Sequence, residues 1–353
     1  MSKEGIYGKT ARYDRDFLVS TENKKYKVTH LGDLCYNPAN LKFGVICLNT
    51  YGDAIFSPIY VTFEIEASFD PDFIGAYLTR WDFINRALKY QQGTVYERMA
   101  VSPEDFVSIK CCFPQKAEQT RLAEFITLLD KRIAAQGKYV ESLKKYKRGV
   151  VRTLLSPKHC SIKNARWTTS RIGDIGIFIK GAPLSKADIS LEGTPFILYG
   201  ELYTTYSEVI SNVVRKTQAS VDKQYYSQIG DVIIPTSGET PEEISTASCV
   251  MLPDIILAGD LNIYRCTQVD GRIMSYILNH VVNDRIARIA QGKSIVHVQA
   301  AEISKIEITY PDPFSQKIII AILAAISDRI DQSNAELRLL NELRKALLQK
   351  LFI

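Results

Sequence analysis

The segment Phe113-Pro-Gln-Lys-Ala-Glu-Gln119 and the segment Tyr310-Pro-Asp-Pro-Phe-Ser-Gln316 match each other at an offset of 197 residues. The match continues without a gap as far as Leu154 and Leu351. Apolar residues that match apolar residues can reflect a shared helical period alone. A shared helical period does not explain the matched Pro, Gln and Arg residues, which therefore indicate an internal duplication. The aligned apolar positions of the first copy are Leu122, Phe125, Leu129, Ile133, Val140, Leu143, Val150 and Leu154, and those of the second are Ile319, Ile322, Ile326, Ile330, Leu337, Leu340, Leu347 and Leu351.

Shorter matches upstream extend the duplication into the segment before each helix. Gln92-Gly93 aligns with Gln291-Gly292, and Gly32-Asp33-Leu34 aligns with Gly230-Asp231-Val232. Each copy therefore consists of a mixed globular unit followed by one long helix. The copies differ at their starts, because 63 residues lead from Trp167 to Gly230 whereas only 31 precede Gly32. We expect the first globular unit to lack roughly the first 30 residues of the pattern.

The two predicted helices carry a coiled-coil type of seam. Residues 118–155 have apolar side chains at steps of three and four, and residues 319–351 repeat this pattern. Proline precedes both helices and Pro157 ends the first, but none interrupts either seam. Gln136 and Ser333 occupy equivalent seam positions, where a polar residue sets the register at some cost in stability.

Two arrangements of these helices are open. Each helix could pack onto its own globular unit, but at 1.5 Å per residue it is roughly 55 Å long. A globular unit of about 110 residues has a radius of gyration of only roughly 13 Å. We therefore expect the two helices to pair antiparallel and to hold the two globular units apart. The positions expected to pack in this pairing are Leu129, Leu143, Ile326 and Leu340.

The composition is that of an ordinary globular protein with a mildly basic charge. Hydrophobic residues make up 46% and charged residues 24% of the 353 positions, and the net charge is +5. This charge permits a nucleic-acid partner without requiring one. Residues 115–156 carry ten Lys or Arg against four Asp or Glu. That surplus fits either a solvated helix face or a position near a polyanion.

Several features favour a cytoplasmic location. The longest apolar run, Ile318 to Ile326, has nine residues, which is too few for a membrane span. The first nine residues are too polar for a secretory signal. The seven cysteines include no Cys-x-x-Cys pair, and an odd number of thiols fits a reducing compartment.

The globular units are predicted to be mixed α+β. Alternation and turn signals predict strands, and helical spacing predicts one amphipathic helix near the end of each unit. The predicted strands are 194–199, 229–235, 255–258 and 261–266, and the predicted helices are 273–290 and its counterpart 72–89.

No motif of the chain supplies recognisable catalytic chemistry. The stretch Ala287-Arg-Ile-Ala-Gln-Gly292-Lys293-Ser294 resembles a phosphate-binding loop, but Ala287 replaces the first glycine and a helix precedes it. Tyr310-Pro-Asp-Pro-Phe314 and Asn37-Pro-Ala-Asn40 lack the consecutive prolines of the catalytic loop of amino methyltransferases. The four histidines show no metal-ligand spacing, and no nucleophile elbow is present. We expect no enzymatic activity, no cofactor and no metal.

The repeated order of these phrases resembles the specificity (S) subunit of type I restriction–modification enzymes. The phrases that carry the resemblance are Tyr26-Lys-Val-Thr-His-Leu-Gly-Asp-Leu-Cys-Tyr-Asn37, Gly52-Asp-Ala-Ile-Phe-Ser-Pro-Ile-Tyr60, Pro114 through Gln119, Tyr199-Gly-Glu-Leu-Tyr203 and Gly230-Asp-Val-Ile-Ile234. The resemblance covers the whole chain. The first unit departs from the family by lacking a start like Trp167-Thr-Thr-Ser-Arg-Ile-Gly-Asp174.

This resemblance implies two target recognition domains, each reading one half of a split site on double-stranded DNA. It also implies that the helices fix the spacer and dock two methyltransferase subunits, that restriction subunits join the full complex, and that no membrane is involved. The corresponding division is 1–113 and 158–312 for the recognition domains, and 114–157 and 313–353 for the helices.

Polar, basic and aromatic loop residues are the candidates for DNA contact, because base edges and phosphates are bound by such side chains. The candidates in the first unit are Lys9, Arg12, Lys42, Gln92, Thr94, Tyr96 and Arg98. Those in the second are Lys180, Lys186, Tyr203, Thr204, Thr205, Tyr206, Ser237, Glu239, Thr240, Lys293 and Ser294. For each of them a solvated surface role is the alternative.

Two other functions are compatible with the sequence. A two-headed coiled-coil adaptor would join two protein partners without binding DNA, and an enzyme with an unrecognised site is a third option. Salt-dependent DNA binding separates the first function from the adaptor.

Overall fold

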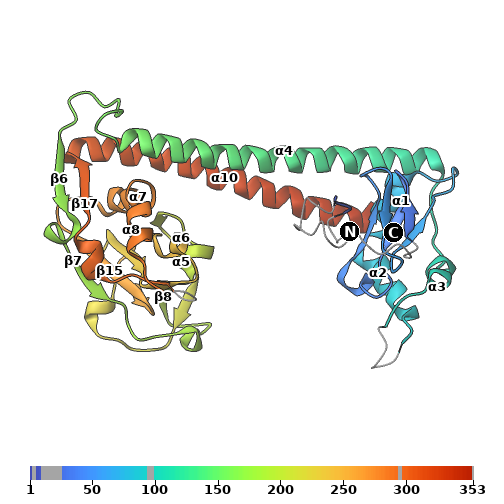
Figure 1. The fold of residues 1–353 in the computed structure, drawn as a ribbon, viewed down its shortest axis with the longest axis horizontal. Coiled ribbons are helices and arrows are strands. Elements are labelled where there is room, and N and C mark those ends of the chain that lie inside the picture. The colour runs from blue at the N-terminus through green and yellow to red at the C-terminus, as the bar shows by residue number, and fades with distance from the viewer. Residues whose placement is uncertain (2–4, 9–25, 94–98, 293–295, 352–353) are drawn as a thin grey trace. The chain divides into compact units, whose positions relative to one another are not determined.

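The computed structural model describes residues 1, 5–8, 26–93, 99–292 and 296–351, and it divides into two compact units. The first unit is Met1–Lys138 with Asn334–Ile353, and the second is Tyr139–Ser333. Two long helices, α4 (Lys116–Leu154) and α10 (Pro313–Leu351), each have 39 residues and contribute one part to each unit (Figure 1). The prediction of two long helices of equal length is confirmed.

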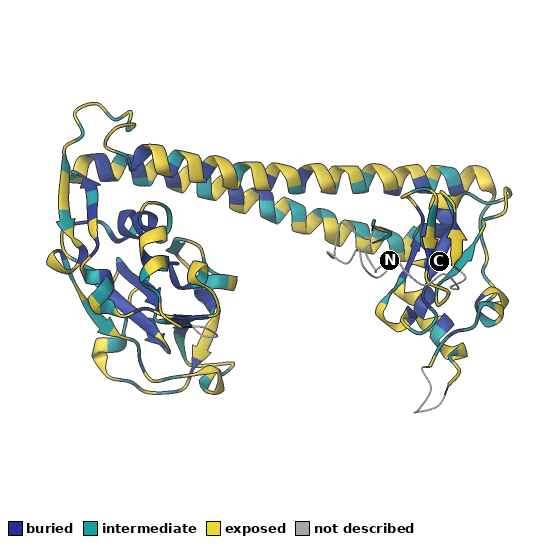
Figure 2. Cartoon of the chain, in the orientation of Figure 1, coloured by how far each residue is buried: buried dark blue, intermediate teal, exposed yellow. Residues whose placement is uncertain are grey.

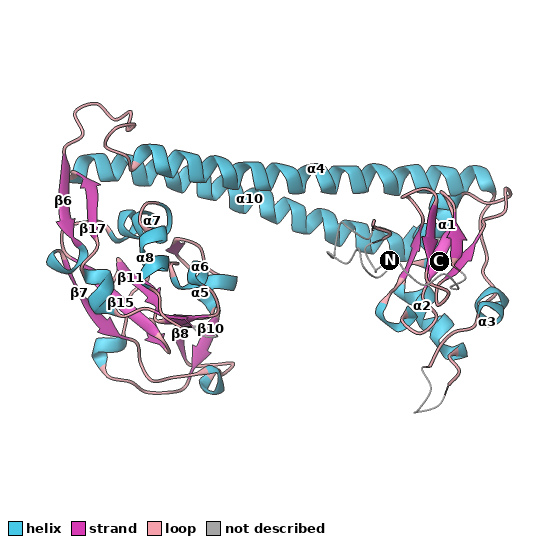
Figure 3. Cartoon of the chain, viewed as in Figure 1, coloured by secondary structure: helices cyan, strands magenta, loops and turns pink. Residues whose placement is uncertain are grey.

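The globular part of the first unit contains two small antiparallel sheets, with short helices beside them (Figure 3). In one sheet β2 lies between β3 and β5, and in the other β1 pairs with β4. The strands are β1 (Lys27–Thr29), β2 (Leu34–Tyr36), β3 (Ile46–Leu48), β4 (Ala54–Phe56) and β5 (Val61–Phe63). The helices are η3 (Leu41–Phe43), α1 (Pro71–Leu78), α2 (Trp81–Ala87), η4 (Leu88–Tyr90) and α3 (Pro103–Ser108).

The second unit has a larger sheet of order β7-β15-β11-β13-β9, a sheet of order β10-β8-β14, and the pairs β12–β16 and β17–β6. The strands are β6 (Trp167–Arg171), β7 (Gly176–Lys180), β8 (Thr194–Leu198), β9 (Val209–Ile210), β10 (Arg215–Thr217), β11 (Asp231–Pro235), β12 (Ser237–Gly238), β13 (Ser248–Val250), β14 (Ile256–Ala258), β15 (Leu261–Cys266), β16 (Val296–His297) and β17 (Glu307–Pro311). The helices are η5 (Ile172–Asp174), η6 (Lys186–Asp188), α5 (Glu201–Thr204), η7 (Lys223–Tyr225), α6 (Pro241–Ile244), α7 (Gly271–His280), α8 (Asn283–Ile289) and α9 (Ala300–Ser304).

The turn before the central strand is the same in both units. Gly32 and Gly230 have φ of +91° and +95°, a region that glycine adopts without a steric penalty. The side chain of the following aspartate accepts a backbone N–H bond, from His30 to Asp33 at 2.7 Å and from Gln228 to Asp231 at 2.8 Å. The strand that follows then pairs with two neighbours, β3 and β5 in one unit and β13 and β15 in the other. These repeated details support the duplication inferred from sequence.

A buried glutamine ties the start of each long helix to the globular part of its unit. Gln119 Oε1 accepts a hydrogen bond from the backbone N–H of Asp70 at 3.0 Å, and Nε2 donates to the carbonyl of Pro114 at 2.8 Å. Gln316 repeats both bonds with Asp270 at 2.9 Å and Pro311 at 2.8 Å. Asp70 and Asp270 are themselves the N-caps of α1 and α7.

Each core takes the start of one long helix and the end of the other. Ala123 belongs to the core of the first unit, and Leu348 and Leu351 of α10 pack against that core. Val151, Leu154, Ile319 and Leu323 belong to the core of the second unit. The start of each helix therefore packs onto the globular core that precedes it in sequence, as in the alternative arrangement considered from the sequence, whereas its end packs onto the other core. Figure 2 shows the buried residues gathered in the sheets of each unit.

Away from their ends the helices contact each other within each unit. In the first unit Arg132 Nη2 donates to Glu336 Oε1 at 2.7 Å, and Arg344 Nη2 donates to Asp130 Oδ2 at 3.0 Å. In the second unit Arg329 Nε donates to the hydroxyl of Tyr139 at 3.3 Å. Gln136 and Ser333 are buried, and the predicted packing positions Leu129, Leu143, Ile326 and Leu340 are half-buried.

The predicted seam is wrong at two equivalent positions. Phe125 and Ile322 are 48% and 38% exposed, whereas the residues after them, Ile126 and Leu323, are 4% and 0% exposed. The reason is that the first turns of each helix face a globular core. The buried face there is rotated by one residue from the heptad seam.

A buried ion pair fastens the end of α4 in the second unit. Lys147 Nζ donates to Glu208 Oε2 at 2.8 Å, and His280 Nε2 lies 2.7 Å from Glu208 Oε1. Burial opposes ionisation of Glu208, but the hydrogen bond from His280 and the charge of Lys147 outweigh it and lower its pKa to about 2. Lys147 is equivalent to Arg344, whose partner Asp130 is replaced by Ser327 in the second copy. The cation therefore pairs with a carboxylate of the globular part instead.

Two further expectations differ from the structure. The predicted helix 273–290 is two helices, α7 and α8, and its counterpart 72–89 is broken in the same way between α1 and α2. Because the apolar spacing continues through both breaks, periodicity does not reveal them. Strands β6 to β10 of the second unit have no counterpart among the described residues of the first. The expected shortening of the first unit by roughly 30 residues stays a prediction, because most of the residues before Tyr26 lie outside the described chain.

Candidate nucleic-acid interface

The predicted DNA contacts are only partly covered by the described chain. Seven of them lie outside the described residues, namely Lys9, Arg12, Thr94, Tyr96, Arg98, Lys293 and Ser294. In the first unit Lys42 is exposed in η3, with its ammonium 5.2 Å from the ring centre of Phe43. Gln92 is exposed, and its Nε2 donates to Asp105 Oδ2 at 3.2 Å.

Several predicted loop residues of the second unit have structural roles. Ser237 is buried in β12 rather than exposed on a loop, and its hydroxyl donates to Asp260 Oδ2 at 2.7 Å. The hydroxyl of Tyr203 donates to the carbonyl of Ser237 at 2.8 Å, and burial raises the pKa of Tyr203. Tyr206 accepts a backbone N–H bond from Val214 at 3.2 Å.

Four more of the predicted residues lie at or near helix ends. Thr240 is the N-cap of α6 and accepts a bond from the backbone N–H of Glu243 at 3.2 Å, while Glu239 precedes it and is exposed. Thr204 and Thr205 are exposed at the end of α5. These exposed positions are free to meet a partner, whereas Ser237 and Tyr203 position other groups.

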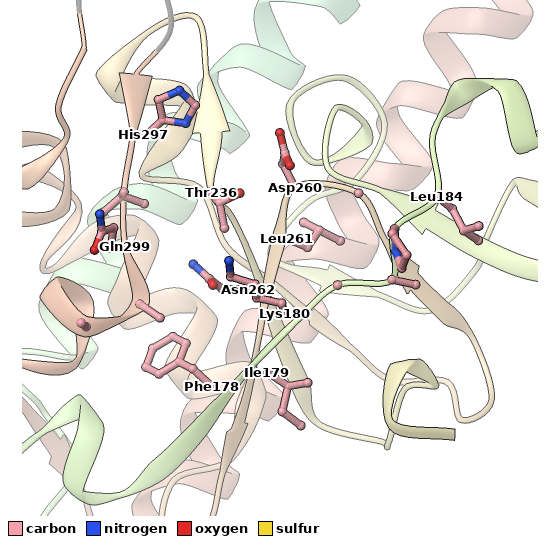
Figure 4. A pocket seen from close by; sticks show the side chains of 17 residues that line it. Phe178, Ile179, Lys180, Leu184, Thr236, Asp260, Leu261, Asn262, His297 and Gln299 are labelled. Carbon is pink, nitrogen blue, oxygen red and sulfur yellow. The ribbon is translucent and has the colours of Figure 1, made fainter. Parts of the chain in front are cut away.

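A groove of about 940 Å³ lies at one end of the larger sheet of the second unit (Figure 4). Its polar lining comes from β7, the junction of β11 and β12, β15, β16 and the N-cap of α9, which places donors and acceptors around one space. The polar side chains of the lining are Lys180, Thr236, Asp260, Asn262, His297 and Gln299. The sequence analysis singled out Lys180 among them and missed the other five.

Asn262 is the unusual member of this lining. It lies in β15, in a run of four buried residues from Leu261 to Tyr264, and is 3% exposed. Its Nδ2 has no hydrogen-bond partner among the described residues. Leaving a buried donor unpaired costs about 1–3 kcal/mol. The sequence signal was a single amide that interrupts the apolar strand Leu261-Asn-Ile-Tyr264.

Lys180 is the direct neighbour of Asn262 across the strand pair β7–β15. Residues opposite each other in an antiparallel pair project from the same face, with Cβ atoms about 5 Å apart. Lys180 is exposed and forms no ion pair within the described parts of the chain. Figure 4 shows Asn262 and Lys180 between Gln299 on one side and Asp260 on the other.

A second hollow, of about 660 Å³, adjoins the groove through Leu184, Gly259 and Asp260. Lys186 and Thr204, both predicted contacts, line it. Arg215 also lines this hollow, but its Nε donates to the buried carboxylate of Glu201 at 2.8 Å. The structure therefore brings Lys180, Lys186 and Thr204 onto adjoining hollows of one unit.

Among the residues that the structure describes, no cluster of three His, Cys, Asp or Glu side chains could hold a metal ion. Within the same residues, no helix is long and apolar enough to cross a membrane.

Comparison with known proteins gives one family and a set of similar folds. Residues 164–342, just over half of the chain, match the family described as Type I restriction modification DNA specificity domain. None of the curated proteins matches the chain.

Two similar solved structures share the fold across nearly the whole chain. One comes from work on the structural basis of complex assembly and conformational transition of the type I R-M system. It is 18% identical to this chain, with a TM-score of 0.61, and the match covers 94% of this chain and 84% of that one. The other is the crystal structure of the type I restriction-modification system S subunit from M. genitalium. It is 16% identical, with a TM-score of 0.57, and the match covers 93% of this chain and 84% of that one.

Proposed function

This chain belongs to the family of type I restriction–modification DNA specificity subunits, and we propose that it reads a two-part site on double-stranded DNA for such a complex. Subunits of this family are not catalytic themselves, so methyl transfer and cleavage belong to other subunits. In this proposal residues 1–113 and 158–312 are the recognition domains, and each serves one half-site.

The polar groove of the second unit is the observation that carries the proposal. It holds Lys180, which forms no ion pair among the described residues, and the amide of Asn262 on the neighbouring strand. Amide side chains read base edges in DNA, and lysines bind both phosphates and base edges. The adjoining hollow adds Lys186 and Thr204.

The duplicated helices support the remaining part of the proposal. In it, α4 and α10 pair antiparallel along their lengths, separate the two recognition domains and set the spacer between the half-sites. Their equal length of 39 residues and the matched junctions at Gln119 and Gln316 suit a two-fold arrangement. The same repetition offers two equivalent docking surfaces for two methyltransferase subunits, which the restriction subunits then join.

Salt-dependent DNA binding tests the proposal directly. The full chain is purified with its methyltransferase subunits, and binding to genomic fragments is measured between 50 and 200 mM salt. We expect affinity to fall steeply as salt rises, because phosphate contacts release counterions. Sequencing of the methylated sites should then give two short clusters with a fixed spacer. A chain that binds its protein partners but no DNA would instead be a protein adaptor.

A further inference from the structure

The last three turns of α4 carry a surplus of positive charge on one side of the helix. Residues 142–173 include nine Lys or Arg and no Asp or Glu. Four of these cations are exposed on α4, and at about 100° per residue they fall within one arc of about 100° around the helix. All four belong to the second unit. This basic arc consists of Lys144, Lys145, Arg148 and Arg152.

Most of the charge in the basic arc has no acidic partner. Lys144 pairs with Glu141 at 2.8 Å on the same helix. Lys145, Arg148 and Arg152 form no ion pair among the described residues. Like charges four residues apart destabilise a helix, and Arg148 forms such a pair with both Lys144 and Arg152. Because these pairs oppose helix stability, folding does not account for them.

The helix dipole does not account for the basic arc either. Cations are favourable in the last turn of a helix, and the effect fades beyond that turn. Helix α4 ends at Leu154, and Arg152 is the basic residue of its last turn. Lys145 and Arg148 lie further from the end, so the dipole gives no reason for their charge.

The second copy of the helix lacks the basic arc. The residues 197 positions later are Asn341, Glu342, Lys345 and Gln349, whose charges sum to zero. In the proposed function two methyltransferase subunits dock on equivalent surfaces, so a docking surface for them would be present in both copies. A surface that belongs to one copy favours a partner that the second unit meets alone. In that function this partner is its own half-site on the DNA.

The charge and extent of the basic arc suit a DNA backbone. Lys144 and Arg152 are eight residues apart, which is about 12 Å along the helix. Double-stranded DNA carries one negative charge per roughly 1.7 Å of its axis, so it offers several phosphates over this length. None of the four residues lines the groove that contains Lys180. Contacts to phosphates position a protein on the duplex without reading its sequence.

We propose that Lys145, Arg148 and Arg152 bind the phosphate backbone of the DNA beside the half-site read by the second unit. This inference rests on the proposed function and adds a second contact surface, outside the groove. The basic arc then strengthens binding and makes it more sensitive to salt, but it does not select the bases.

The test measures how DNA affinity depends on salt when these three charges are removed together. The full chain, in complex with its methyltransferase subunits, is bound to the duplex defined by methylation-site sequencing. For the triple variant Lys145→Gln, Arg148→Gln and Arg152→Gln, the slope of log affinity against log salt should fall by about 1 per lost contact. Raising salt from 50 to 200 mM should then weaken the variant about 40-fold less than the wild type. The methylated sequence should stay the same.

The duplication provides a matched control for a single charge. Lys345 is equivalent to Arg148 and is also exposed, but it lies in the first unit. Arg148→Gln should lower the salt slope by about 1, whereas Lys345→Gln should leave it unchanged. Equal changes would show a general effect of net charge and would overturn the inference.

Thermal unfolding gives a readout that needs no DNA. Because Arg148→Gln removes two like-charge pairs from α4, the melting temperature of this variant should be equal to or above that of the wild type. A clear fall would mean that Arg148 is held within the protein, which contradicts a role in binding DNA.

The remaining outcomes separate this inference from the function on which it rests. If the wild-type complex shows no salt-dependent DNA binding, the proposed function is wrong and this inference falls with it. If the wild type binds and the triple variant keeps the same salt slope, only the present inference is wrong. If the triple variant no longer co-purifies with the methyltransferase subunits, the basic arc docks protein and the inference is again wrong.

Discussion

Arg132 donates to the carboxylate of Glu336 at 2.7 Å, and this contact recurs with exchanged partners elsewhere in the chain. The residue 197 positions after Arg132 is Arg329, and the residue 197 positions before Glu336 is Tyr139. Arg329 Nε donates to the Tyr139 hydroxyl at 3.3 Å. Each helix thus supplies the arginine in one unit and its acceptor in the other. The sequence duplication therefore appears as equivalent contacts in which the two helices exchange roles.

A charge introduced into the helix contact should destabilise the chain strongly. Val140 is 3% exposed on α4, so Val140→Asp would bury an unpaired carboxylate and should cost about 3–5 kcal/mol. Phe125→Asp is the matched control, because Phe125 is 48% exposed on the same helix. Urea unfolding of both variants should show a large loss of stability for Val140→Asp alone. Equal losses would contradict the seam described here.

The buried ion pair should make stability depend on acid pH. The folded-state pKa of Glu208 is about 2, below its ordinary value of 4.5. Its contribution is therefore fully present above about pH 4.5 and is lost as pH falls toward 2. Glu208→Gln should cost about 3 kcal/mol at pH 7, because it leaves Lys147 without its carboxylate.

The control for this prediction is Glu141→Gln, which breaks an exposed pair with Lys144. Such surface pairs contribute little to stability. Unfolding measured from pH 7 to 3 should show the difference between wild type and Glu208→Gln shrinking, with no comparable trend for Glu141→Gln. A difference that stays constant down to pH 3 would argue against the lowered pKa.

The two glutamine junctions should respond alike to mutation. Gln316→Ala leaves the backbone N–H of Asp270 without its acceptor, which should cost roughly 1–3 kcal/mol. Gln119→Ala removes the equivalent bond to Asp70 and should cost a similar amount. Hydrogen exchange at the starts of α1 and α7 should report each loss in its own unit only. Loss of protection in both units from one change would mean that the junctions are not independent.

Helix length should set the spacer of the DNA site. Four residues inserted after both Gln136 and Ser333 add roughly 6 Å and rotate the following segment by about 40°. That length corresponds to roughly two base pairs at 3.4 Å each. Methylation-site sequencing of the assembled enzyme should show a longer spacer, or no activity, with both half-site sequences unchanged. Altered bases at constant spacing would contradict this division of roles.

The chain alone should transfer no methyl group. Its sequence carries neither the consecutive prolines of a methyltransferase catalytic loop nor a glycine-rich cofactor loop. DNA incubated with the methyl donor and the purified chain should stay unmodified, whereas adding the methyltransferase subunits should restore transfer. Methylation by the single chain would show that a catalytic site was overlooked.

The features that could be predicted from the sequence are those that follow from the internal repeat or from the helical period. The equivalence of Gln119 and Gln316, and of Gly32 and Gly230, is visible as matched letters, and both pairs form matched contacts. The exposure of Phe125 was not predictable from period, because the globular core that rotates the buried face is formed by residues distant in sequence.

The groove was harder to predict than the helices. Lys180 was selected as a basic loop residue, although the structure places it at the end of β7, and Asn262 is a single polar residue inside a predicted strand. Its Nδ2 has no partner among the described residues, and only the packed structure reveals this. Ser237 shows the opposite error, since a polar residue in a turn-like sequence proved to be buried and bonded to Asp260.

The first unit is built from two segments that lie far apart in the chain, and this has a consequence for its synthesis on the ribosome. Its core includes Leu348 and Leu351, although most of its residues precede position 139. The second unit, Tyr139–Ser333, is continuous in sequence and can close as soon as it has emerged. At about 5–20 residues per second, the first unit must wait roughly 10–40 s for its last helix. During that interval the part of the core that Leu348 and Leu351 cover stays open to solvent, so the unit that is made first is completed last.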